Sequence, residues 1–74
     1  MKESSSATAE IATTLQTRRK SLGVTQAQLA DLAGVSPKFV YDLEKGKPSV
    51  SLDRVLLVIS ALGLSFNLEI MANE

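Results

Sequence analysis

The sequence of 74 residues contains no cysteine and no histidine. The lack of cysteine excludes disulfide bridges and thiolate metal ligands, and it is compatible with a reducing cytoplasm. Without histidine, the usual zinc sites, the Cys-His and Ser-His nucleophile pairs and the commonest general base are excluded as well. We therefore expect no catalytic residue, no metal site, no cofactor and no enzymatic activity.

Long apolar runs are also missing. The densest one, Val55 to Ile59, is far shorter than the roughly 20 residues that span a bilayer. Residues 1–8 contain serines and a glutamate instead of a continuous apolar stretch, so they predict a flexible arm and not a signal peptide or membrane anchor. The sequence thus predicts a soluble, cytoplasmic protein.

Neither sign of charge is in excess, because eight basic and eight acidic residues cancel. Their distribution is uneven, since residues 18–47 hold six bases and three acids, a local charge of +3. Such a basic stretch favours nucleic-acid binding, although helical surfaces often carry mixed charge without any ligand. Charge alone leaves both interpretations open.

Helical spacing recurs along the chain, and each helical segment is followed by a glycine that can end it in a left-handed conformation. The predicted helices span about residues 9–22, 26–33, 37–45 and 52–62. Thr25 and Gln28 form a capping-box pattern before the second helix, and Ser36 with Pro37 suits the first turn of the third. Two short helices joined by a glycine-containing turn predict a helix-turn-helix unit.

The last part of the chain has a different pattern. The fourth predicted helix is apolar around most of its circumference, which indicates burial on two sides. Residues 64–70 alternate between apolar and polar side chains, as a half-buried strand does. No other segment alternates, so the strand is expected to pair with a second copy of itself about a two-fold axis. The alternative is an extended tail on its own core. The predicted dimer interface comprises Leu57, Val58, Leu64, Phe66, Leu68 and Ile70.

A series of short motifs follows in a fixed order along residues 11–64: Arg19, Leu22-Gly23-Val24-Thr25-Gln26, Leu29-Ala30, Gly34-Val35-Ser36 and Leu43-Glu44-Lys45-Gly46. Their order and spacing resemble the phage-repressor-like helix-turn-helix domains, the group that includes Cro and lambda-repressor proteins. Residues 64–70 resemble the strand-swapping tail of HipB-like antitoxins. The implied fold is an all-α domain of four to five helices with a C-terminal strand that pairs across a dimer.

The resemblance also implies roles for single residues. The positions that usually face bases are occupied by Pro37, Lys38, Tyr41 and Asp42. Gln26 matches a phosphate-contacting glutamine, and Arg19 with Glu44 matches an enclosed structural ion pair. Further phosphate contacts are expected from Ser36, Lys45, Lys47 and Lys20.

The chemistry of the predicted base-facing residues agrees in part with these roles. Lys38 can donate to guanine, and Asp42, one helical turn later, can accept from cytosine, although this pair is also an ordinary surface ion pair. Pro37 offers only apolar contact, for example with a thymine methyl group.

We expect three regions: a flexible arm (1–8), a DNA-binding domain (9–63) and a dimerisation strand (64–71). The predicted function is a homodimeric transcriptional repressor of a palindromic operator, associated with the bacterial nucleoid, and specifically a HipB-like antitoxin that regulates its own operon with a HipA-like kinase toxin as partner. One alternative is a stand-alone phage or plasmid repressor. Another is a protein–protein adaptor that does not bind DNA.

Overall fold

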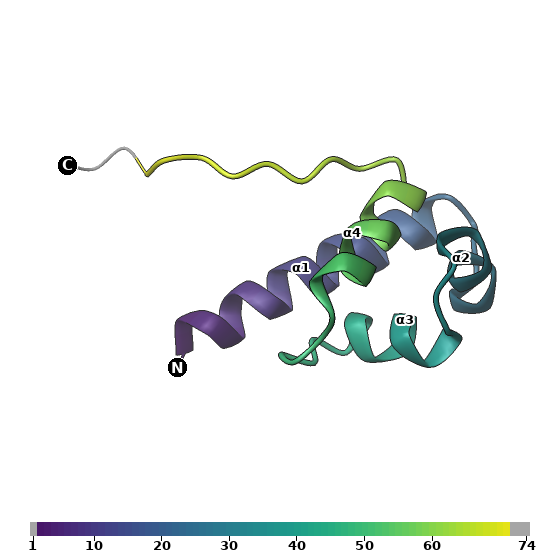
Figure 1. Cartoon of the computed structure of the whole chain (residues 1–74), viewed down its shortest axis with the longest axis horizontal. Coiled ribbons are helices and arrows are strands. Elements are labelled where there is room, and N and C mark those ends of the chain that lie inside the picture. The colour runs from purple at the N-terminus through teal and green to yellow at the C-terminus, as the bar shows by residue number, and fades with distance from the viewer. Residues whose placement is uncertain (1, 72–74) are drawn as a thin grey trace.

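The computed structural model describes residues 2–71, with side chains from residue 7 onward. This part of the chain forms four helices: α1 (Lys2–Ser21), α2 (Gln26–Ala33), α3 (Pro37–Glu44) and α4 (Leu52–Ala61). Helix α2 packs against α3 and α4, and α1 packs against α3 (Figure 1). The expected all-α architecture with four helices is confirmed for the described residues.

Side-chain caps define where α2 and α3 begin. Thr25 Oγ1 accepts a hydrogen bond from the Gln28 amide at 3.0 Å, and Gln28 Oε1 accepts one from the Thr25 amide at 2.9 Å. Ser36 Oγ accepts from the Phe39 amide at 3.0 Å, and Pro37 is the first residue of α3. Each cap satisfies amides that the first helical turn leaves unpaired. The capping signals predicted from the sequence are confirmed.

The core consists of one apolar stripe from each helix. Leu15 of α1, Leu29 of α2, Val40 of α3 and Val58 of α4 are each at most 3% exposed. Gly34 makes the tight turn between α2 and α3 possible, because it ends α2 at a φ of +76°, a conformation that residues other than glycine rarely adopt. The link between the two helices is therefore short and well defined.

The expected start of the first helix at residue 9 was wrong, because α1 begins at Lys2. Residues 2–8, interpreted above as part of a flexible arm, form the first turns of this helix, while Met1 lies outside the described residues. The sequence before Gly23 contains neither proline nor glycine, so nothing in it stops a helix from extending backwards. The serines were mistaken for a loop signal.

The C-terminal segment, residues 64–71, leaves α4 as an extended tail that forms no strand in the described chain (Figure 1). A β-strand needs hydrogen bonds to a second strand, and residues 2–63 contain only helices and turns. The predicted pairing across a dimer therefore stays a prediction. Both the tail and the N-terminal half of α1 project from the same side of the helical body.

One predicted interface residue was placed on the wrong face of α4. Val58 is 1% exposed and belongs to the chain's own core, whereas its neighbour Leu57 is 48% exposed. Consecutive helical residues point about 100° apart, so the two side chains cannot serve the same surface. Of these two residues, only Leu57 remains available to a partner.

Candidate nucleic-acid interface

Helices α2 and α3 form a pair joined by residues 34–36 (Figure 1). Pro37 and Lys38, in the first turn of α3, are exposed, whereas Val40 and Leu43 face the core. In a helix-turn-helix unit, the corresponding turn of the second helix reaches base edges in the major groove. The predicted base-facing end of α3 is thus accessible in this structure.

Asp42 lies between two lysines on the outer side of α3. Its Oδ2 is 2.9 Å from Lys38 Nζ and 3.7 Å from Lys47 Nζ. The hydrogen bond from Lys38, together with the charges of both lysines, holds the pKa of Asp42 below its ordinary value. The side chains of Lys38 and Lys47 are 79% and 51% exposed, so both ammonium groups can still reach a ligand.

Tyr41 and Lys45 extend the same exposed surface. Lys45 Nζ lies 5.6 Å from the centroid of the Tyr41 ring, within the range of a cation–π contact. Tyr41 is 50% exposed. The two sets of contacts share no side chain, but both lie on α3 and the residues just after it. Together they comprise five of the predicted site residues, with three positive charges and one negative charge: Lys38, Tyr41, Asp42, Lys45 and Lys47. We call this group the lysine cluster.

The other residues that are predicted to contact phosphates lie outside the lysine cluster. Ser36 uses its hydroxyl oxygen to cap α3. Gln26 Nε2 donates to Glu44 Oε1 at 2.9 Å, which uses one of its two amide hydrogens and leaves the other for a ligand. Lys20 is exposed in the last turn of α1, outside the α2–α3 pair.

Arg19 and Glu44 form the predicted enclosed ion pair. Arg19 Nε and Nη2 donate to the two carboxylate oxygens of Glu44 at 2.6 and 3.0 Å, and Nη1 donates to the Val24 carbonyl at 2.8 Å. The side chains of Arg19 and Glu44 are 10% and 2% exposed. Gln16 and Gln26 also donate to Glu44 Oε1, at 3.3 and 2.9 Å. One carboxylate therefore joins α1, α2 and α3.

Sequence reasoning missed two structural contacts made by α1. Gln16 was not singled out, although it precedes Arg19 by three residues and so shares a helix face with it. Arg18, counted only as part of the basic stretch, donates from Nε to the Leu62 carbonyl at 2.9 Å. This bond satisfies a carbonyl at the C-terminal end of α4, next to the start of the tail. Arg18 thus has a structural contact on the other side of α1.

Within the described residues, no cluster of acidic side chains has the arrangement of a metal site. A helix long and apolar enough to cross a membrane was not found in the same part of the chain.

Comparison with known proteins agrees with this geometry. A family model described as helix-turn-helix matches residues 15–68, which include the α2–α3 pair and the lysine cluster. A relative from Sinorhizobium fredii, named as an uncharacterized HTH-type transcriptional regulator, is 38% identical over 60 residues. That alignment covers 81% of this chain and 79% of the relative.

We expect Glu44→Ala to lower the free energy of unfolding by about 3–5 kcal/mol, because it leaves the enclosed guanidinium of Arg19 without its counter-ion. Urea or thermal unfolding at one fixed protein concentration measures the change. Asp42→Ala is the matched control, since it removes a carboxylate from a more exposed ion pair and should change stability little. An unaltered melting temperature for Glu44→Ala would contradict this role.

The carboxylate of Glu44 should make the stability of the fold depend on pH in the acidic range. Burial alone would raise the pKa of Glu44, but hydrogen bonds from Arg19 and two glutamines hold it below its ordinary value of 4.5. Because the folded pKa is the lower one, this stabilisation is complete above about pH 4.5 and is lost as the pH falls through the folded pKa. Glu44→Gln does not titrate, so its stability should decline less steeply in acid than that of the unaltered protein. Identical acid profiles would refute the assignment.

Proposed function

Because this chain belongs to the phage-repressor-like helix-turn-helix family of DNA-binding transcriptional regulators, we propose that it is a sequence-specific repressor that binds a palindromic operator as a homodimer. The observation that carries the proposal is the lysine cluster, whose three exposed lysines lie on α3 and the residues that follow it. Cationic side chains at this position match the phosphate-rich rim of a major groove.

Base recognition is assigned to the outer residues of α3. Lys38 can donate to guanine O6 and N7 once it exchanges its bond with Asp42 for one with the base. Asp42 then accepts from the amino group of a neighbouring cytosine, while Lys47 continues to balance its charge. Pro37 and Tyr41 add apolar contacts, for example with thymine methyl groups. Lys38 and Asp42 together favour a half-site that contains a G·C step.

Backbone contacts are assigned to Lys45, Lys47, Lys20 and Ser36, and to the free amide hydrogen of Gln26. Glu44 holds the Gln26 side chain by a 2.9 Å hydrogen bond, so this amide is oriented before DNA arrives. A preoriented donor loses less conformational entropy on binding. Each lysine that neutralises a phosphate makes affinity more dependent on salt.

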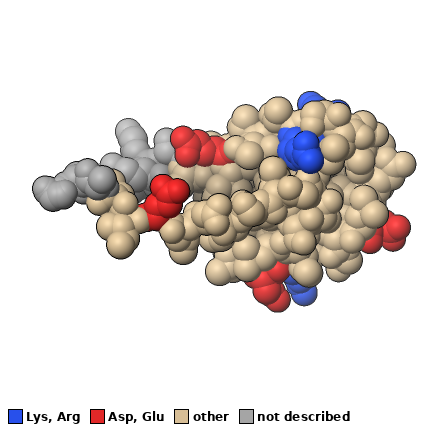
Figure 2. Space-filling model, turned by 90° about the horizontal axis from the view of Figure 1, so that it is seen from above, with Lys and Arg blue, Asp and Glu red and all other residues tan. Residues whose placement is uncertain are grey.

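Dimer formation is supported by unburied apolar surface on α4 and the tail. Leu57, Phe66, Leu68 and Ile70 are between 48% and 97% exposed. Figure 2 looks down on the side of the molecule where the tail lies, and uncharged residues cover most of that surface. Exposed apolar side chains that gather on one surface often mark a protein interface. We assign this surface, together with Leu64, to a second copy whose recognition helix reaches the next half-site about 34 Å away.

The narrower assignment as a HipB-like antitoxin rests on the resemblance of residues 64–70 alone. It implies regulation of its own operon and a HipA-like kinase toxin as partner. Copurification of the chain with a kinase encoded beside its gene tests this assignment separately from DNA binding.

Lys38→Ala and Lys47→Ala should affect DNA binding in different ways, although each removes one charge. Lys38→Ala should lower affinity for the operator by about 1–3 kcal/mol more than for unrelated DNA, because it removes a base contact. Lys47→Ala should weaken both complexes alike, and it should reduce the number of counterions released on binding by about one. Anisotropy titrations at several salt concentrations, with DNA from upstream of the gene, measure both effects. If DNA affinity changed neither with salt concentration nor with either substitution, the alternative of a protein–protein adaptor would be favoured.

Truncation after Gly63 removes the whole tail and should convert the dimer to a monomer. Operator affinity should fall with it, because one α3 helix offers too few phosphate contacts for a stable complex. Sedimentation and DNA titration of the full and shortened chains measure both properties, and helical circular dichroism controls for folding. A shortened chain that is still dimeric would overturn the role of the tail.

A further inference from the structure

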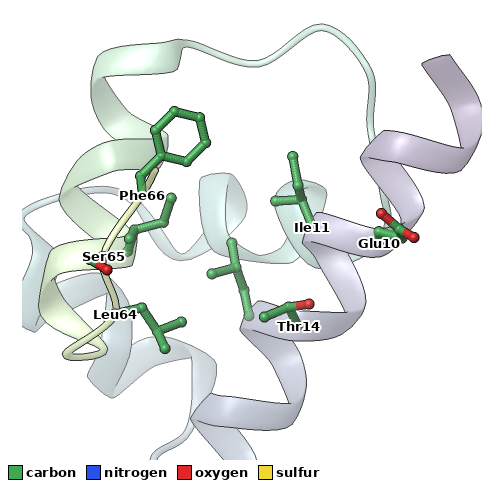
Figure 3. A pocket seen from close by; sticks show the side chains of 8 residues that line it. Glu10, Ile11, Thr14, Leu64, Ser65 and Phe66 are labelled. Atoms are coloured by element: carbon green, nitrogen blue, oxygen red, sulfur yellow. The ribbon is translucent and has the colours of Figure 1, made fainter. Parts of the chain in front are cut away.

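A cavity of about 200 Å³ lies between α1, α4 and the beginning of the tail (Figure 3). Its apolar walls come from Ile11 and Leu15 of α1, Ile59 of α4, and Leu64 and Phe66 of the tail. Glu10 is the one ionisable side chain among the residues that line it. The site is therefore suited to an uncharged, apolar group.

The cavity is large enough to hold a side chain. An apolar cavity of about 150 Å³ can accommodate a small hydrocarbon molecule. Ile11 and Phe66, which stand on opposite sides of the opening in Figure 3, are 39% and 48% exposed. An apolar occupant would remove both from water, which is favourable in proportion to the area covered.

The chain's own tail does not fill this space. Leu68 and Ile70 are 85% and 97% exposed, so the tail leaves the cavity after Phe66. At about 3.3 Å per extended residue, Ile70 lies roughly 13 Å beyond Phe66. Even-numbered residues of the tail share one face, because side chains alternate along an extended segment. Leu68 and Ile70 are exposed, and they therefore lie on the same face of the tail as Leu64 and Phe66, which line the cavity.

Pairing with the tail of a second copy would bring these side chains to that copy's cavity. An antiparallel pair of tails centred on Asn67, the midpoint of residues 64–70, has the greatest overlap and pairs apolar with apolar residues. In this register Leu68 lies opposite Phe66 of the second copy, and Ile70 lies opposite Leu64 of the second copy. Phe66 and Leu64 are both cavity residues.

We propose that this cavity is the receptor for Ile70 of a second copy, so that each chain seats its tail in the other chain's cavity. The proposal rests on the homodimer proposed above and names the surface that the tail occupies. It makes the dimer reciprocal, because each chain supplies one tail and one cavity.

Cysteine cross-linking can test the arrangement in the full chain, because the protein has no cysteine of its own. Asn67→Cys tests tail pairing alone. A residue opposite itself in an antiparallel pair has a Cα separation of about 4.5–5.5 Å, within the range that a disulfide bridges. Oxidation should therefore link two Asn67→Cys chains.

The cavity is tested by mixing Ile70→Cys chains with either Thr14→Cys or Thr13→Cys chains. Both threonines are exposed neighbours on α1, but of the two only Thr14 lines the cavity. We expect the heterodimer of Ile70→Cys with Thr14→Cys to form several-fold faster than that with Thr13→Cys. Labelling of each single variant with iodoacetamide controls for thiol reactivity.

The outcomes separate the two proposals. Cross-linking of Asn67→Cys without any preference for Thr14→Cys would overturn the receptor and leave the dimer intact. A chain that is monomeric by mass and forms none of these disulfides would overturn both. Preference for Thr14→Cys supports the reciprocal exchange.

Discussion

The ion pair between Arg19 and Glu44 holds the α1, α2 and α3 helices in one fixed relation. Both side chains are largely enclosed, and a buried charge without its partner costs several kilocalories per mole. The fold therefore tolerates little change in the position of either group. Because Gln26 donates to the same carboxylate, the beginning of α2 is tied to the end of α3, next to Lys45 of the lysine cluster.

Two carboxylates on one short helix show how packing divides their roles. Glu44 faces the core side and accepts hydrogen bonds from three different side chains. Asp42 faces outward, where it contacts the exposed ammonium groups of Lys38 and Lys47. The exposed ion pairs contribute little to stability, so their charges stay available for the exchange with bases and phosphates that we propose. The enclosed pair is committed to structure.

Neighbouring arginines on α1 contact two different parts of the molecule. Arg19 donates to Glu44 of the α2–α3 pair, whereas Arg18 donates to the Leu62 carbonyl at the end of α4. The tail departs one residue after Gly63, close to this bond. Helix α1 thus contacts both the element assigned to DNA and the element assigned to a second copy. A rigid link of this kind suits a dimer that must match two half-sites of fixed spacing.

By itself the sequence determined the beginnings and ends of α2 and α3, because caps such as Thr25 with Gln28 act between residues only a few positions apart. It also pointed to the Arg19–Glu44 pair and the outer residues of α3, through motifs that resemble a known family. Only the tertiary structure decided that Gln16 and Gln26 reach Glu44, that Arg18 turns to α4, and that Val58 points inward while Leu57 does not. These features depend on how segments distant in sequence pack together, and local spacing contains no information about that packing.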